Sequence, residues 1–168
     1  MGGIMNKKIL IIGIVTLLID QITKIIIDLA LKIDETVSVI KNFFYITRVS
    51  NTGAAFSILE GKTILLSIVS VIAVILLLRY MKDFKNNKLV NLSFGLLLGG
   101  IIGNFGDRLF LGYVRDFLKF NIFGYNYPVF NIADATIVIG VILLIICMIR
   151  GDEISGNSSK HWWRNQTR

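Results

Sequence analysis

The chain has 168 residues, enough for one domain, and 54% of them are hydrophobic while only 17% are charged. A water-soluble domain of this size needs more charge to cover its surface, so a mean hydropathy of +0.71 predicts an integral membrane protein. The net charge of +7 is spread between apolar runs rather than gathered in one stripe. This pattern favours membrane orientation, and no nucleic-acid partner is expected.

Four apolar runs approach the ~20 residues that a helix needs to cross a bilayer. The first follows Lys7 and Lys8 and is interrupted by polar residues. Because no small-residue cleavage site follows its apolar half, we expect an uncleaved helix rather than a secretory signal. The four predicted spans cover about 9–31, 62–80, 89–110 and 131–150.

Lys and Arg near the helix ends predict the orientation. The short connection 79–88 carries four basic residues, and both ends of the chain are basic. The longer connections, 32–62 and 112–130, hold only six basic residues across 50 positions. Both termini are therefore predicted to be cytoplasmic and the two long connections extracytoplasmic. Residues 1–150 form the predicted single transmembrane domain, and 151–168 a polar cytoplasmic tail.

The two outer connections carry patterns of their own. Residues 43–51, FFYITRVSN, are aromatic and β-branched and predict a strand. Residues 121–128, NIFGYNYP, predict a turn whose aromatic side chains suit the membrane–water interface. The predicted fold is thus mainly α: four transmembrane helices with a small, strand-rich extracytoplasmic platform.

Ionisable residues inside the first span suggest function by default, because each costs ~2.5–3.5 kcal/mol on insertion scales. Asp20 and Lys24 lie four residues apart and therefore on one helix face. They predict an internal ion pair with a structural role; the alternative is that they orient a site. Asp28, near the end of this helix, is predicted to be solvated.

The third span combines a packing pattern with a polar stripe. Small residues recur every four positions and predict close helix packing: Gly95, Gly99 and Gly103. Packing does not explain Asn104, whose amide needs partners if it is buried. We expect Asn104 and Arg108 to contact a polar ligand, with Asp107 holding Arg108 in place. The alternative is a packing seam that ends in an interfacial Asp107–Arg108 pair.

Asp134, at the start of the fourth span, has a purely structural explanation. Asn131 is placed to N-cap this helix, and an acid in its first turn meets the helix dipole favourably, by ~0.3–1 kcal/mol. Asp116 alone would be an ordinary loop acid. Both carboxylates, however, are predicted at the outward ends of helices and at one membrane depth. Two adjacent carboxylates share a proton, which provides a base to activate water and an acid to polarise a carbonyl.

The other residue types narrow the possible chemistry. Cys147 lies inside an apolar run and His161, the one histidine, lies in the tail, so no metal, disulfide or cofactor is expected. A proton-coupled transporter would use the acids of several spans as a relay, but the pair Asp116 and Asp134 clusters at one face. A purely structural subunit leaves the outer polar motifs unexplained.

Four segments in order resemble one family, the prolipoprotein signal peptidases (signal peptidase II), membrane aspartic peptidases of bacterial lipoprotein maturation. The segments are DQITK (20–24), SNTGAAF (50–56), GNFGDRLFLGYVRDF (103–117) and FNIADATI (130–137). The resemblance spans 6–150. Two departures are visible: Arg115 stands where the family usually has an apolar residue, and Ala135 where serine is common. Arg115 would lower the pKa of Asp116 if it pointed inward.

The resemblance implies that Asp116 and Asp134 are the catalytic dyad. It also implies a role for each of the other matching positions. The substrate pocket would be formed by Asn51, Gly53, Gly103, Asn104, Arg108 and Asn131. Mainly structural roles would fall to Asp20, Lys24 and Asp107.

The activity implied by the resemblance is cleavage of lipidated prolipoproteins just before the diacylglyceryl-modified cysteine. It would take place at the extracytoplasmic face of the bacterial cell membrane. The implied partners are these precursors, membrane lipids and globomycin-type inhibitors, and no cofactor is implied.

Overall fold

The computed structural model describes residues 6–53 and 59–152. The end of the SNTGAAF segment (54–56) and most of the predicted tail, including His161, lie outside the described residues. The predictions made for them stay predictions.

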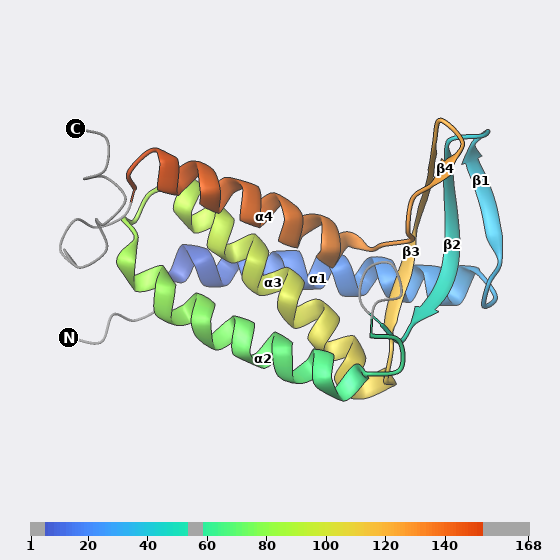
Figure 1. The fold of residues 1–168 in the computed structure, drawn as a ribbon, viewed down its shortest axis with the longest axis horizontal. Helices are drawn as coiled ribbons and strands as arrows, with labels where there is room; N and C mark the ends of the chain where they lie inside the picture. The colour runs from blue at the N-terminus through green and yellow to red at the C-terminus, as the bar shows by residue number, and fades with distance from the viewer. Residues whose placement is uncertain (1–5, 54–58, 153–168) are drawn as a thin grey trace.

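Four helices run side by side, and a small sheet lies across one end of the bundle (Figure 1). The helices are α1 (Lys7–Ala30), α2 (Thr63–Tyr80), α3 (Lys88–Leu111) and α4 (Ile132–Ile149). Each has at least 18 residues and is apolar enough to cross a membrane. At ~1.5 Å per residue, the shortest spans roughly 27 Å, close to the hydrocarbon thickness of a bilayer. The four predicted spans are confirmed to within two residues at every end.

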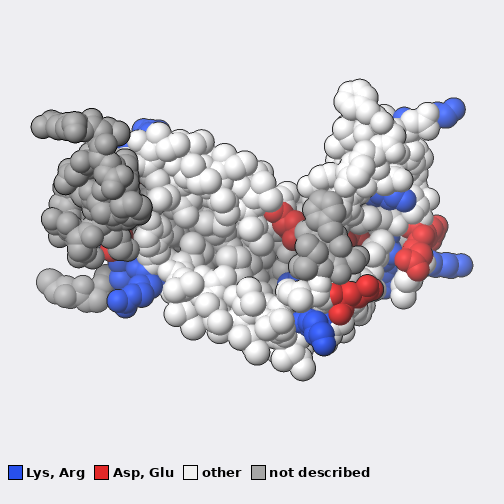
Figure 2. Space-filling view, viewed as in Figure 1, with Lys and Arg blue, Asp and Glu red and all other residues white. Residues whose placement is uncertain are grey.

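The distribution of charge agrees with a membrane-spanning bundle. Figure 2 shows charged residues at the end of the bundle away from the sheet, and again from the part of the helices nearest the sheet onto the sheet itself, while the helix flank between them is uncharged. Exposed side chains along this part of the helices are Ile, Leu and Val, such as Ile11, Leu18, Ile72 and Ile142. Exposure of so large an apolar surface to water is unfavourable, whereas contact with the hydrocarbon chains of lipids is favourable.

The two ends of the described chain meet at the end of the bundle away from the sheet (Figure 1). There the Asn6 amide donates to Asn86 Oδ1 (2.6 Å), and the Lys85 backbone N–H donates to the Asp152 carbonyl (2.8 Å). An even number of spans requires this arrangement. Exposed basic side chains accompany it: Lys7, Lys8, Arg79, Lys82, Lys85 and Lys88.

α3 is the central helix. In its most apolar stretch 61% of residues are buried, against 22% or fewer in the other helices. Glycines explain how two helices approach it closely. A Cβ on Gly99 would lie 2.5 Å from the Cβ of Thr16 in α1, and one on Gly100 would lie 2.7 Å from the Ala133 carbonyl in α4. The predicted glycine seam is confirmed, and it packs against α1.

The sheet has four antiparallel strands in chain order: β1 (Thr36–Ile40), β2 (Phe44–Asn51), β3 (Val114–Ile122) and β4 (Tyr125–Asn126). The strand predicted over 43–51 is confirmed. The turn expected over 121–128 is shorter, because β3 continues to Ile122 and β4 begins at Tyr125. β3 was not predicted. Its first residues are buried on both faces, which removes the alternation that identifies a half-exposed strand.

Gly112 makes the turn from α3 into β3. Its φ of 81° is the left-handed conformation that favours glycine, and its N–H donates to the Arg108 carbonyl (3.2 Å). The chain then enters β3 at Val114, two residues before Asp116. This acid therefore lies on a strand and not, as expected, at a helix end. The strands run across the helix axes (Figure 1), so β3 carries Asp116 beneath the start of α4.

Candidate active site

The first turn of α4 fixes Asp134. The side chain of Asn131 accepts from the Asp134 N–H (2.9 Å), and Asp134 Oδ2 accepts from the Asn131 N–H (3.2 Å). This reciprocal capping box confirms the predicted helix start. Asp20 Oδ1 accepts from a third N–H of the turn, that of Ala133, at 2.9 Å. Because three N–H groups are bound to side chains, the position of Asp134 is rigidly defined.

Asp116 is held on the sheet by two amides. It is only 3% exposed. Its Oδ1 accepts from Asn131 Nδ2 at 2.6 Å, and its Oδ2 accepts from Asn51 Nδ2 at 2.8 Å. Since Val49 lies opposite Asp116 in the β2–β3 pairing, Asn51 is its diagonal neighbour on the same face. Strand register and the α4 cap thus converge on one carboxyl group.

Two buried asparagines connect the carboxyl groups of Asp116 and Asp134. Asn131 bonds to both of them, as described above. Asn104 donates to Asp134 Oδ1 (2.7 Å), and its own Oδ1 accepts from Asn131 (3.1 Å) and from Lys24 (3.0 Å). The prediction that Asn104 binds a polar ligand stays a prediction. Its side-chain oxygen and amide nitrogen already bond inside the protein, which favours a role in orienting Asp134.

Burial raises the pKa of Asp116, and the nearby charge of Asp134 raises it further. Hydrogen bonds from Asn51 and Asn131 and the charge of Lys24 oppose this shift, and the resulting pKa is about 7. A carboxyl group with this pKa is protonated in about half of the molecules at neutral pH. Asp116 is thus able to donate a proton under conditions in which an exposed aspartate is fully ionised.

A charge ladder of alternating acids and bases lies beside the site. Lys24 Nζ is 2.8 Å from Asp20 and 3.1 Å from Asp107. Arg115 is 2.6 Å from Asp107 and 3.2 Å from Asp28, and Arg48 is 2.8 Å from Asp28. In order along these contacts, the charge ladder comprises Asp20, Lys24, Asp107, Arg115, Asp28 and Arg48. The predicted Asp20–Lys24 ion pair is present, and both side chains are 0% exposed.

The charge ladder corrects two expectations. Asp107 does not hold Arg108, because adjacent residues on a helix point in different directions; it pairs instead with Lys24 and Arg115. Asp28 is not simply solvated, because its side chain is 25% exposed and bonds to Arg115 and Arg48. Arg115 itself points toward these acids rather than toward Asp116.

Arg108 lies at a groove beside the carboxyl pair. Its Nη2 donates to the Gly53 carbonyl (3.1 Å), and the Gly53 N–H donates to Asn51 Oδ1 (2.8 Å). Its Nε is buried and has no hydrogen-bond partner within the described part of the chain. Its charge interacts with those of Asp134 and Asp116. The groove, of about 450 Å³, lies between α2 and α3 and is lined by Thr63, Ile64, Ser67, Ile68, Val71, Ile72, Phe105, Arg108 and Leu109.

Gly103 has a packing role at the same level. A Cβ added there would lie 2.6 Å from Asp20 Oδ2 and 3.6 Å from the Cβ of Ala133. A Cβ would therefore displace the Asp20 carboxyl group, whereas its distance to Ala133 is an ordinary van der Waals contact. The predicted pocket role of Gly103 stays a prediction, and its structural effect would be exerted through these neighbours.

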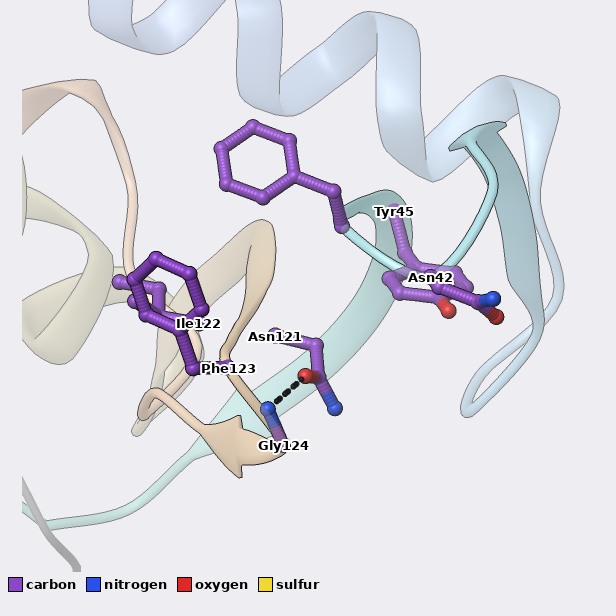
Figure 3. Close-up of a pocket in the computed structure, with 7 residues that line it drawn as sticks. Asn42, Tyr45, Asn121, Ile122, Phe123 and Gly124 are labelled. Atoms are coloured by element: carbon purple, nitrogen blue, oxygen red, sulfur yellow. Dashed lines mark hydrogen bonds between the residues drawn. The ribbon is translucent and has the colours of Figure 1, made fainter.

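A second pocket, of about 500 Å³, lies at the tip of the sheet (Figure 3). It is lined by Asn42, Phe43, Tyr45, Asn121, Ile122, Phe123 and Gly124. None of the predicted site residues lines it, and Tyr45 is its only titratable group. It offers no acid–base pair, so the carboxyl pair is the better candidate for chemistry. Among residues 6–53 and 59–152, no three His, Cys, Asp or Glu side chains are grouped to hold a metal ion.

Gln21 was missed in the sequence. Its Nε2 donates to Asp20 Oδ2 (3.1 Å) and Asp107 Oδ1 (3.3 Å), and its Oε1 accepts from Arg115 (2.7 Å). The signal was present, since a glutamine next to an acid inside an apolar span needs polar partners. The identity of those partners depends on the fold.

Comparisons with known proteins agree with one another. A family model described as "Signal peptidase (SPase) II" matches residues 12–150. A lipoprotein signal peptidase of Staphylococcus haemolyticus (strain JCSC1435) is 44% identical over 142 residues, covering 84% of this chain and 90% of that protein. Two solved structures are described as a bacterial membrane enzyme determined by the in meso method, at 2.3 and 1.9 Å resolution. Both are 40% identical and match 87% of this chain, with TM-scores of 0.80 and 0.78, and 90% and 95% of their own chains are covered.

Proposed function

The chain belongs to the signal peptidase II family, whose members remove signal peptides from prolipoproteins, and on this premise we propose that it is an aspartic endopeptidase. The bond it cuts lies just before the diacylglyceryl-modified cysteine. One observation carries the proposal: a single buried asparagine, Asn131, bonds to the carboxyl groups of both Asp116 and Asp134. Two acids held together in this way are suited to general acid–base hydrolysis.

In the proposed mechanism the two acids take different roles. Asp116, with a pKa of about 7, holds the proton and donates a hydrogen bond to the scissile carbonyl. Asp134 serves as the base in this proposal, because its oxygens accept from a backbone N–H and an amide at a helix N-terminus, where negative charge is favoured. It takes a proton from water as the water oxygen attacks the carbonyl carbon. The proton then passes to the leaving amine as the peptide bond breaks.

The proposed substrate path follows the groove between α2 and α3. The apolar lining suits the signal helix or the lipid chains, and the guanidinium of Arg108 suits head-group or main-chain oxygens. Asn51 and Gly53 border the carboxyl pair from the β2 side. We assign Asn104 and Gly103 to positioning, because the first bonds to Asp134 and the second gives room to Asp20.

The proposed location is the bacterial cell membrane, with the sheet and the carboxyl pair at the extracytoplasmic face. Its support is the set of exposed lysines and arginines at the opposite end of the bundle, since basic residues favour the cytoplasmic side. Both termini are then cytoplasmic. This orientation gives a peptide outside the membrane access to the site.

The direct test uses the purified enzyme, a lipidated precursor in detergent or liposomes, and the variants Asp116→Asn and Asp134→Asn. Each should lower kcat on the order of 10³-fold, because a neutral amide neither accepts nor donates the transferred proton. Asp34→Asn is the matched control: Asp34 is exposed and has a φ of 63°, which asparagine tolerates. Cleavage at the wild-type rate by either dyad variant would falsify the aspartic mechanism.

An independent test of the pocket is inhibition by globomycin, which the family resemblance implies. The wild-type enzyme should be inhibited. An active enzyme insensitive to this compound would contradict the pocket assignment while leaving the dyad in place.

A further inference from the structure

Arg115 makes an unusual number of bonds for a residue next to a catalytic acid. Its Nη2 and Nε bond to Asp107 Oδ1 (2.6 Å) and Oδ2 (3.3 Å), and its backbone N–H also donates to Asp107 Oδ2 (3.1 Å). Its Nη1 donates to Asp28 Oδ2 (3.2 Å), and its Nη2 reaches Gln21 Oε1 (2.7 Å). One side chain on β3 is therefore bonded to both α1 and α3.

Strand geometry places Arg115 and Asp116 on opposite faces of β3, because successive side chains alternate. On one face, Asn51 and Asn131 bind Asp116. On the other face, α1 and the end of α3 bind Arg115. The start of β3 is thus fixed on both sides, and neither rotation nor sliding of the strand is possible without breaking an ion pair.

We propose that Arg115 is a positioning residue, a clamp that joins the start of β3 to α1 and α3 and thereby holds Asp116 against Asp134. This inference rests on the proposed function, because it assigns to Arg115 the alignment of the proposed dyad. Arg115 does not bond to either carboxyl group of the dyad, so it acts through the backbone of its neighbour.

The guanidinium group is suited to this role. Its planar fork bonds to two acids at once, whereas a lysine ammonium is a point charge that holds one geometry less firmly. The buried acids of the charge ladder also need the positive charge of Arg115. Without Arg115, Lys24 alone would have to neutralise Asp20 and Asp107, which are 0% and 2% exposed. A buried acid without a base is strongly unfavourable, so the surrounding elements would shift.

The displacement would reach the second acid as well. Asp107 contacts Lys24, Lys24 donates to Asn104, and Asn104 donates to Asp134. Loss of the arginine would therefore disturb both carboxyl groups, Asp116 through the strand and Asp134 through this chain of contacts. Misplacement of catalytic groups by about 1 Å is enough to cost on the order of 10²-fold in rate.

The test compares three variants with a control from the same strand. Arg115→Val removes the clamp and Arg115→Lys keeps its charge. Asp28→Asn removes the outer acid, which pairs with both Arg115 and Arg48. Lys119→Val is the control, since it also replaces a basic residue with valine on the same face of β3. Its ammonium lies 6.0 Å from the Tyr45 ring centroid and is not part of the charge ladder. kcat and KM are measured with a lipidated precursor, and kcat is expressed per folded molecule, as determined by circular dichroism.

We expect Arg115→Val to lower kcat about tenfold with KM within twofold of wild type, because Arg115 positions the dyad without touching substrate. Arg115→Lys should recover part of the lost rate. Asp28→Asn should cost about threefold, because the Asp107 bonds remain. Lys119→Val should stay within twofold. A merely structural role would change the folded fraction and leave kcat per folded molecule unaltered.

Three results would overturn the clamp: Arg115→Val with kcat within twofold of wild type, a higher KM at unchanged kcat, or an equal loss in Lys119→Val. If Arg115→Val does not fold, the clamp is tested with Arg115→Lys and Asp28→Asn. A wild-type kcat in both of these variants would reject the clamp. Asp116→Asn, assayed alongside, separates the two proposals. An active Asp116→Asn enzyme defeats the dyad and the clamp together, whereas an inactive one beside a normal Arg115→Val defeats the clamp alone.

Discussion

The two halves of the bundle bury different kinds of side chain. In the half away from the sheet, the main core cluster is apolar and is formed by Ile9, Phe84, Val90, Phe94, Leu98 and Cys147. The buried polar residues there, Asn91 and Ser93, are uncharged. In the half next to the sheet, the same helices bury charged and amide side chains. These are Asp20, Lys24, Asn104, Asp107 and Asn131.

The difference separates a half with an apolar core from a half that surrounds the proposed active site. Apolar side chains pack in a membrane bundle without a desolvation penalty, whereas buried charges need opposite charges and rarely increase stability compared with an apolar core. A cluster that brings no gain in stability is explained by the two carboxyl groups it surrounds. Substitutions in the far half should therefore change stability alone, and substitutions near the sheet should change turnover as well.

Apart from loss of the dyad itself, the largest effect is expected for Lys24→Met in the half near the sheet. It leaves Asp20 and Asp107 with one base fewer at buried positions, which should cost about 3–5 kcal/mol of unfolding free energy. It also removes a donor to Asn104, so kcat should fall about 100-fold. Chemical unfolding in detergent and precursor cleavage measure the two effects. The exposed Lys8→Met is the control, and equal behaviour of both variants would contradict the division into halves.

Phe94→Ala tests the opposite half. Phe94 is fully buried, and its ring packs edge-on against the ring of Phe84, with 5.4 Å between the ring centroids. The cavity should cost about 3 kcal/mol of unfolding free energy, while kcat per folded molecule stays within twofold of wild type. The same unfolding and cleavage assays apply. A large loss of kcat without a loss of stability would show that the far half also controls the site.

How far the sequence predicts this division depends on whether a signal is local. The helices and the α4 cap were predictable, because length, hydropathy and the Asn131–Asp134 spacing are properties of short segments. The partners of Asp107 were not, because Arg115 reaches it only after Gly112 reverses the chain. The carboxyl pair was predicted from the two outer acids and then from the resemblance to a family, in which an apolar residue is usual where this chain has Arg115. The clamp is visible only in three dimensions.

Asn131 allows the two roles of one residue to be separated. Asn131→Ser keeps an oxygen that caps α4 but loses the amide that donates to Asp116, so kcat should fall about tenfold with little change in stability. Asn131→Ala loses both and should also cost about 1 kcal/mol of unfolding free energy. Comparison of the two variants by unfolding and by cleavage measures each part. Equal kcat in Asn131→Ser and wild type would show that this amide does not prepare the dyad.

The smallest effect concerns the proton on Asp116, and its sign follows from burial. The folded enzyme holds this proton up to about pH 7, whereas an unperturbed aspartate loses it near pH 3.8. As pH rises from 7 to 8 the protonated fraction falls about fivefold, and kcat/KM should fall with it. Over the range between pH 3.8 and 7 the folded chain binds a proton that the unfolded chain lacks, so wild-type stability should decrease as pH rises. Asp116→Asn should lack this decrease, and stability can be measured on this variant even if it no longer cleaves substrate. A rate independent of pH between 6 and 9 would assign the catalytic proton to another group.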